Sequence, residues 1–147
     1  MTQVYVLSGP NLGRLGAREP DVYGTVNYDT LTQLINQWAA ERDMAARILQ
    51  SDSEAQLIGW LHEAADLKVD VVFNPAAFTH FSYAIRDAAA MVTATGGKLI
   101  EVHLTNPATR ERFRHNSVIS GVASGTIAGF GVDSYRLALE SLTSQRQ

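Results

Sequence analysis

Cysteine is absent from this chain of 147 residues, and the absence excludes disulfide bonds, thiolate metal sites and a cysteine nucleophile. No apolar run approaches the length of a membrane span. The start, Met1-Thr2-Gln3, has no basic segment of the kind that opens a signal peptide. We therefore expect a soluble protein of the cytoplasm with no membrane partner.

The chain also has few charged residues of either sign. Charged residues make up 18% of the chain, hydrophobic residues 46%, and the net charge is -3. Nucleic acid binds to positively charged surfaces, and this chain is mildly acidic, so no nucleic-acid partner is expected. The length fits a single domain over residues 1–147. The low charge leaves surface for contacts between subunits.

Strand-like and helix-like patterns alternate along the chain. Apolar runs with strand character follow Gln3 and then cover Ala45–Leu49, Val69–Phe73, Leu99–Leu104 and Thr126–Phe130. Helical patterns fill the intervals, with starts signalled by Asn27 or Asp29, Asp52 or Ser53, Ser82, Asn106-Pro107 and Val132. This order predicts an α/β fold, a flavodoxin-like, doubly wound sheet of five parallel strands with helices on both faces.

The stretch after the first strand is unusual because it is long and has no clear helical pattern. It begins Gly9-Pro10-Asn11, and its apolar residues, Leu15 and Tyr23 among them, would anchor it to the body of the protein. Long ordered loops in compact domains are usually functional. We expect a structured, mobile lid over about residues 11–24.

Ligands of doubly wound sheets bind beyond the carboxyl ends of the strands, so the residues there are the candidates for a site. They include amides, imidazoles and guanidiniums, which suit a small anionic, polyhydroxylated substrate. The pattern has no metal-ligand spacing, and no metal is expected. The candidates at these ends are Asn11, Arg18, Tyr23, Asn74, His80, Glu101, His103, Thr105, Asn106, Arg110, Arg112 and Arg114.

Arg18 precedes Tyr23 by five residues in the predicted lid. A free tyrosine has a pKa of about 10, so using it as a base at neutral pH costs roughly 4 kcal/mol. A guanidinium within about 4–6 Å favours the phenolate and reduces that cost. The spacing alone equally allows an aromatic anchor beside a surface arginine.

Glu101 and His103 alternate on one strand and therefore share a face. A carboxylate placed there can fix the imidazole tautomer and leave a proton donor at the strand tip. A buried histidine bonded to the backbone is the alternative. His80 and Asp87 lie close to two helical turns apart, although Asp87 also fits a solvated helix surface.

Several ordered blocks of this sequence together resemble the type II 3-dehydroquinate dehydratase family over nearly the whole chain. The blocks are Gly9-Pro10-Asn11-Leu12, Leu15-Gly16, Arg18-Glu19-Pro20, Tyr23-Gly24, Asn74-Pro75-Ala76-Ala77, Thr79-His80, Arg86-Asp87, Ile100-Glu101-Val102-His103-Leu104, Asn106, Phe113-Arg114-His115, Ser117 and Tyr135-Arg136-Leu137-Ala138-Leu139. The resemblance implies a flavodoxin-like fold, a dodecamer built as a tetramer of trimers, and anti elimination of water from 3-dehydroquinate without cofactor or metal.

The resemblance also implies roles for individual residues. Tyr23 is then the base, Arg18 the lid arginine that lowers the phenol's pKa, and His103 the acid oriented by Glu101. A water near Asn11 and the Pro10 backbone stabilises the enolate. The carboxylate end of the substrate and its departing hydroxyl are then bound by Asn74 and the backbone of Leu104 and Thr105. The ring hydroxyls are bound by His80 and Arg114, and Asp87 reaches the site across the trimer interface.

Gly13-Arg14, the segment 107–112 and Asn116 depart from the usual family pattern. None of these departures removes a proposed catalytic group, so we expect them to affect the packing of the lid, turnover and inhibitor preference rather than the reaction class. Three alternatives stay open: a non-catalytic flavodoxin-like module that binds FMN or a nucleotide, a Schiff-base dehydratase using Lys68 or Lys98, and a structural oligomer without turnover. The loop at residues 8–13 has neither GxGxxG nor a Walker pattern, and neither lysine lies at the predicted carboxyl end of a strand.

Overall fold

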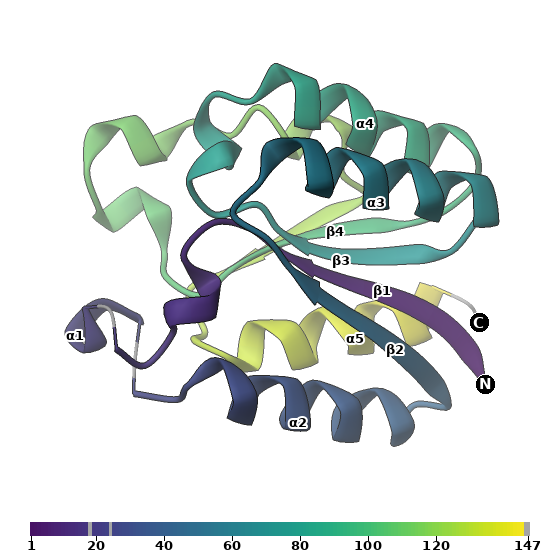
Figure 1. Ribbon diagram of the computed structural model, residues 1–147, viewed down its shortest axis with the longest axis horizontal. Coiled ribbons are helices and arrows are strands. Elements are labelled where there is room, and N and C mark those ends of the chain that lie inside the picture. Colours follow the sequence, from purple (N-terminus) through teal and green to yellow (C-terminus); the bar gives the residue numbers. More distant parts are fainter. Residues whose placement is uncertain (18, 24, 146–147) are drawn as a thin grey trace.

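The computed structural model describes residues 1–17, 19–23 and 25–145 of the chain. It contains a five-stranded parallel sheet in the order β2-β1-β3-β4-β5, with helices on both faces (Figure 1). This confirms the predicted flavodoxin-like, doubly wound fold. The strands are β1 (Thr2–Ser8), β2 (Met44–Gln50), β3 (Asp70–Asn74), β4 (Leu99–His103) and β5 (Gly125–Ala128).

Two helices cover each face of the sheet. Figure 1 shows α2 (Tyr28–Ala40) and α5 (Asp133–Gln145) on one face, and α3 (Glu54–Leu67) and α4 (Tyr83–Ala94) on the other. The lid contains a 3-10 turn, Leu12–Arg14, and a single-turn helix, α1 (Pro20–Tyr23), where the sequence showed no helical pattern. Further 3-10 turns are Ala76–His80, Pro107–Thr109, Arg112–His115 and Ser120–Val122.

The sheet separates two hydrophobic clusters because successive side chains of a strand point to opposite faces. On one face Val4 and Val6 of β1 pack with residues of α2 and α5. On the other face Tyr5 and Leu7 pack with residues of α3 and α4. The alternation along β1 thus places an apolar layer on each side of the sheet.

Side chains read from the sequence start three of the helices. Asn27 Oδ1 accepts a bond from the Thr30 N–H (2.8 Å), and Ser82 Oγ accepts one from the Ile85 N–H (3.1 Å). Ser53 Oγ accepts from the Gln56 N–H at 3.2 Å. Removing such a cap typically costs about 1 kcal/mol. These caps fix where the chain leaves each connection and therefore how the loops of the site begin.

The strand order reverses between β1 and β3, because the chain runs from β1 outward to β2 and then returns to β3 on the other side. Gly9, directly after β1, donates its N–H to the carbonyl of Asn74 at the end of β3 (2.8 Å). A Cβ at Gly9 would lie 2.6 Å from the Pro75 carbonyl oxygen. Glycine therefore lets the two strand ends approach closely at the point where such folds bind ligands.

No helix in the described part of the chain has both the length and the apolar character needed to cross a membrane.

Candidate active site

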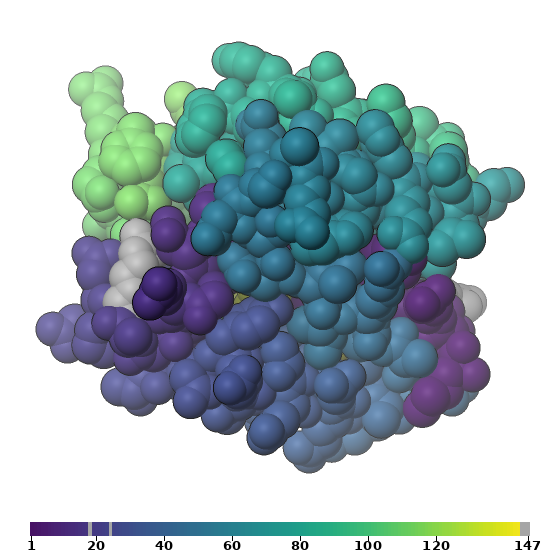
Figure 2. Space-filling model, in the orientation of Figure 1, coloured from purple at the N-terminus to yellow at the C-terminus, as the bar shows by residue number. Residues whose placement is uncertain are grey.

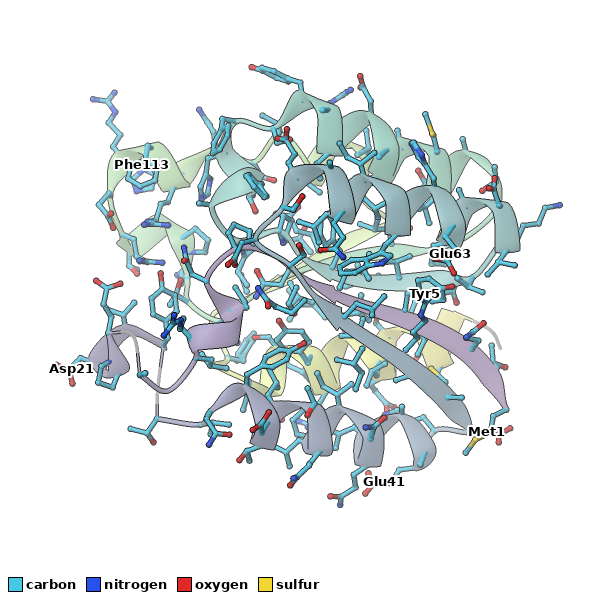
Figure 3. The ribbon with its side chains drawn as sticks, viewed as in Figure 1. Met1, Tyr5, Asp21, Glu41, Glu63 and Phe113 are labelled. Atoms are coloured by element: carbon cyan, nitrogen blue, oxygen red, sulfur yellow. The ribbon has the colours of Figure 1, made fainter. Side chains whose placement is uncertain are left out.

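A polar cleft lies beyond the carboxyl ends of β1, β3 and β4. The residues that line it include nine of the candidates from the sequence: Asn11, Tyr23, Asn74, His80, His103, Leu104, Thr105, Arg110 and Arg114. Pro10 and Leu12 line it as well. Residues of the lid and of the segment after β4 both line this cleft. In Figure 3 the labelled Asp21 and Phe113 mark those two segments.

The imidazole of His103 is held by a buried carboxylate. His103 Nε2 lies 2.6 Å from Glu101 Oε2, and the Glu101 side chain is only 1% exposed. Because an ionised carboxylate only accepts hydrogen bonds, the hydrogen lies on Nε2. The other ring nitrogen, Nδ1, is then the atom available for a ligand in the cleft. The strand alternation thus produces the predicted carboxylate–imidazole pair.

Two serine hydroxyls also donate hydrogen bonds to the Glu101 carboxylate. Ser117 Oγ donates to Oε2 (2.9 Å) and Ser120 Oγ donates to Oε1 (2.6 Å). Burial alone would raise the pKa of the Glu101 carboxyl, but the hydrogen bonds from His103, Ser120 and Ser117 outweigh it and lower the pKa below the ordinary value of 4.5. The carboxylate is therefore ionised throughout the neutral range.

Replacing Glu101 with glutamine should reduce stability in a pH-dependent way. A carboxyl whose pKa is lowered by folding contributes stability that is fully present above 4.5 and disappears as the pH falls through the folded value. The free energy of unfolding of the native protein should therefore be about 1–3 kcal/mol larger than that of Glu101→Gln at neutral pH. Thermal unfolding of both proteins from neutral to acidic pH measures the gap. A gap that widens toward acid would contradict the assignment.

A guanidinium contacts the Tyr23 phenol, and the structure assigns this contact to Arg110. Arg110 Nη2 donates to Tyr23 Oη at 2.8 Å, and its Cζ lies 5.0 Å from the centre of the Tyr23 ring. Its Nη1 also donates to Thr105 Oγ1 (3.3 Å). A charged donor on the phenol oxygen stabilises negative charge there. In Figure 2 the purple lid and the green segment that carries Arg110 lie beside each other at one edge of the molecule.

His80 and Arg114 bring opposite hydrogen-bonding properties to the cleft. His80 Nδ1 lies 2.7 Å from the Asn116 carbonyl oxygen and therefore carries the hydrogen, which leaves Nε2 as an acceptor. Burial lowers the pKa of His80, and the Asn116 bond offsets only part of that effect. Arg114 Nε donates to Glu111 Oε1 at 3.2 Å. The cleft thus offers a neutral acceptor beside a fixed positive charge.

The loop after β1 is held in an uncommon backbone conformation. Asn11 has a φ of 72°, and its N–H donates to Asp52 Oδ1 (2.9 Å). Gln50 Nε2 donates to the Gly9 carbonyl and to Asp52 Oδ1, each at 3.1 Å. Asparagine tolerates the left-handed region better than most residues. These bonds fix the base of the lid against the loop that follows β2.

Four candidates from the sequence are not among the residues that line this cleft: Asp87, Glu101, Asn106 and Arg112. Asp87 lies on α4 with its side chain 72% exposed and 3.4 Å from Arg86 Nη1, and it does not line the cleft of its own chain. Arg18, expected to be the arginine of the lid, lies outside the described residues.

Arg110 is the contact that sequence reasoning missed. It was grouped with Arg112 and Arg114, and only Arg114 was given a role. Its carbonyl accepts a bond from His115 Nε2 (3.0 Å), which ties the loop into a shape that points Arg110 at Tyr23. No signal in the sequence marks this, because the pair is separated by 87 residues.

The chemistry of the cleft favours an organic anion as its ligand. Arg110 and Arg114 supply positive charge, Asn11 and Asn74 supply amides, and His103 supplies an imidazole held by Glu101. Within residues 1–17, 19–23 and 25–145, no cluster of three or more His, Cys, Asp or Glu side chains could hold a metal ion. Fold and cleft together define a doubly wound α/β protein with a polar cleft at its topological switch point.

Comparison with known proteins identifies the family. The model of the family "Dehydroquinase class II" matches residues 2–143. The 3-dehydroquinate dehydratase of Salinispora tropica is 55% identical over 143 residues, which cover 97% of this chain and 98% of that protein. The 3-dehydroquinate dehydratase of Mycobacterium tuberculosis is 50% identical, with 95% of this chain and 92% of that protein covered.

Solved structures agree with the sequence comparisons. The crystal structure of the type II dehydroquinase from Propionibacterium acnes matches with a TM-score of 0.94 and 46% identity, over 98% of this chain and 97% of that one. This chain therefore belongs to the class II dehydroquinases, a family of enzymes, and the resemblance seen in the sequence is confirmed.

Proposed function

We propose that this protein catalyses the anti dehydration of 3-dehydroquinate to 3-dehydroshikimate through an enolate, with Tyr23 as base and His103 as acid. The observation that carries the proposal is a single cleft lined by an Arg110-bonded phenol and a carboxylate-bonded imidazole. Family membership supports the choice of substrate, since relatives at 50–55% identity carry the name 3-dehydroquinate dehydratase.

Tyr23 would act first, as a phenolate that removes a proton from the carbon next to the ketone. The Arg110 guanidinium donates to this oxygen and stabilises the charge that makes it a base. Arg18 belongs to the same lid and would add a second positive charge when the lid closes. The C–H bond breaks, its electron pair moves into the carbonyl as an enolate, and the phenol keeps the proton.

The enolate oxygen would be stabilised by a water held near Asn11 and the Pro10 backbone. Asn11 and Pro10 both line the cleft, and the Asp52 bond to the Asn11 N–H keeps this loop in place. A donor that is already oriented toward developing negative charge lowers the barrier without reorganising.

His103 would complete the elimination from Nδ1. As an imidazolium, it donates the Nδ1 proton to the C1 hydroxyl while the enolate collapses, the C–O bond breaks and water leaves. Neutral His103 then keeps the hydrogen on Nε2, bonded to Glu101. A positioned acid or base typically contributes about 10²–10⁴-fold to the rate. The enzyme regains its starting state when the proton on Tyr23 returns to His103 through solvent.

The remaining residues of the cleft would bind the substrate. Asn74 and the backbone of Leu104 and Thr105 would hold the carboxylate end and the leaving hydroxyl. The acceptor nitrogen of His80 and the charge of Arg114 suit the ring hydroxyls, one as acceptor and one as donor.

Assembly would complete the site. Asp87 is exposed on α4 in the single chain, and we propose that it reaches the cleft of a neighbouring subunit in a trimer. Activity would then depend on assembly, as in a dodecamer built from four trimers. We further propose a cytoplasmic enzyme without cofactor, metal, nucleic-acid or membrane partner, which serves aromatic biosynthesis or quinate breakdown by the same reaction.

The direct test of this function is the absorbance of the conjugated enone when 3-dehydroquinate is added to the purified protein. We expect steady growth of the product band without added metal or cofactor, and we expect activity to survive treatment with substrate and borohydride. A protein that gives no enone, or a flavin spectrum in the purified protein, would contradict the proposal.

Replacing Arg110 with alanine should lower kcat by about 10–10²-fold, because a charged hydrogen bond to the base contributes about 1.5–3 kcal/mol. Arg112→Ala is the matched control, because Arg112 lies in the same segment and does not line the cleft. An unchanged kcat in Arg110→Ala would refute the role.

A further inference from the structure

Tyr135 of α5 has a buried hydroxyl that lies against the ends of two strands. Its side chain is fully buried. Its Oη lies 2.9 Å from Ser8 Oγ and 3.1 Å from Asn74 Nδ2. Ser8 and Asn74 are the last residues of β1 and β3 and are partners in the sheet register. The phenol therefore sits directly beneath the point where the cleft opens.

The hydrogen-bonding capacities of these groups fix the orientation of the Asn74 amide. The Ala76 N–H can only donate, so the Asn74 atom 3.1 Å from it is Oδ1. Nδ2 then faces Tyr135 and donates to its oxygen, and the single hydrogen of the Tyr135 hydroxyl is left for Ser8 Oγ. Burial raises the pKa of Tyr135, so the hydroxyl stays neutral and keeps both functions.

An amide anchored at both of its atoms has one N–H and one lone pair left over. Asn74 is 3% exposed and is one of the residues that line the cleft. A ligand oxygen with negative charge would be met by the N–H if the amide keeps this orientation and by the carbonyl oxygen if it rotates by 180°. In the second case the carbonyl oxygen would repel the negatively charged oxygen of the ligand.

We propose that Tyr135 is a positioning residue that holds the Asn74 amide with its free N–H toward an anionic oxygen of the substrate. The inference rests on the proposed function and deepens it, since it assigns the binding orientation of Asn74 to a residue that does not itself line the cleft. Asn74 binds the carboxylate alike in the ground state and the transition state, so the contribution falls on KM.

Tyr135→Phe tests the proposal because it keeps the ring and removes only the hydroxyl. We expect KM for 3-dehydroquinate and the Kd of the product 3-dehydroshikimate, measured by calorimetry, to rise by about 10-fold, which is the scale of one hydrogen bond. The change in kcat should be small. Tyr28→Phe is the matched control, since Tyr28 packs against the same cluster and does not line the cleft. Unchanged KM and Kd in Tyr135→Phe would overturn the proposal.

Two further variants separate positioning from a loss of folding. In an Asn74→Ala background, Tyr135→Phe should raise Kd no further, whereas additive effects would overturn the proposal. Ser8→Ala leaves both Tyr135 and Asn74 in place and removes the acceptor of the phenol hydrogen. It should also raise Kd, and an unchanged Kd would contradict a role for the hydrogen bonds that link Ser8, Tyr135 and Asn74.

Failure of this inference and failure of the proposed function give different results. If the unmodified protein forms no enone, the proposed function fails. If it forms enone and Tyr135→Phe binds the product normally, only the role of Tyr135 fails.

Discussion

Tyr23→Phe should lower kcat by about 10³–10⁴-fold, toward the upper end of what a positioned general base supplies. The substitution removes one oxygen atom and keeps the ring, which packs against the hydrophobic core. It also removes the acceptor of the Arg110 hydrogen bond, so a guanidinium is left facing an apolar ring edge. KM should change far less than kcat, because the phenol acts on the C–H bond rather than on the carboxylate.

The matched control for this experiment is again Tyr28→Phe, which removes a phenol oxygen from a residue that does not line the cleft. Its kcat should stay within about twofold of the native value. Assembly of both variants can be compared by size-exclusion chromatography, so that loss of the oligomer is not mistaken for loss of the base. If Tyr23→Phe retained a tenth of the native kcat, another group would have to be the base.

His103→Ala should be the second variant with a loss of several orders of magnitude, about 10²–10⁴-fold in kcat. The departing hydroxyl would lack a proton donor, and the buried Glu101 carboxylate would lose one of its hydrogen bonds. His62→Ala is the matched control, since His62 lies on α3 and does not line the cleft. It should leave turnover unchanged.

The two inactive variants should differ in a partial reaction. His103→Ala still carries the base, so in heavy water it should exchange the hydrogen next to the substrate's ketone without releasing water. Tyr23→Phe should catalyse neither exchange nor dehydration. Nuclear magnetic resonance of the unreacted 3-dehydroquinate measures the exchange. If Tyr23→Phe exchanged this hydrogen and His103→Ala did not, the assigned roles would have to be reversed.

Local chemistry made much of the fold predictable from the sequence. Asn27, Ser53 and Ser82 signal helix starts because their oxygens bond to backbone N–H groups two or three residues ahead, which is a matter of spacing alone. The strand ends were predicted to within a residue or two, because each strand is an apolar run that polar or turn-forming residues bound. The turns in the lid were not predicted, because the packing of a single helical turn leaves no periodicity to detect.

The site was predictable to the extent that its contacts are local. Glu101 and His103 are two residues apart on one strand, so the alternation of side chains predicts their pairing. Arg110 with Tyr23, and Tyr135 with Asn74, are separated by 87 and 61 residues, and nothing in the spacing connects them. Such contacts follow from where loops and helices pack. The roles proposed for Arg18 and Asp87 depend on the lid and on a neighbouring subunit, and they remain predictions.

The central claim is that a phenolate and an imidazolium act on opposite faces of the substrate. The most direct test uses 3-dehydroquinate carrying deuterium next to the ketone, on the face opposite the C1 hydroxyl. The account predicts that the product has lost the deuterium and that turnover is slower than with the unlabelled compound whenever C–H cleavage limits the rate. A product that retains the deuterium would show removal from the other face and would contradict the mechanism.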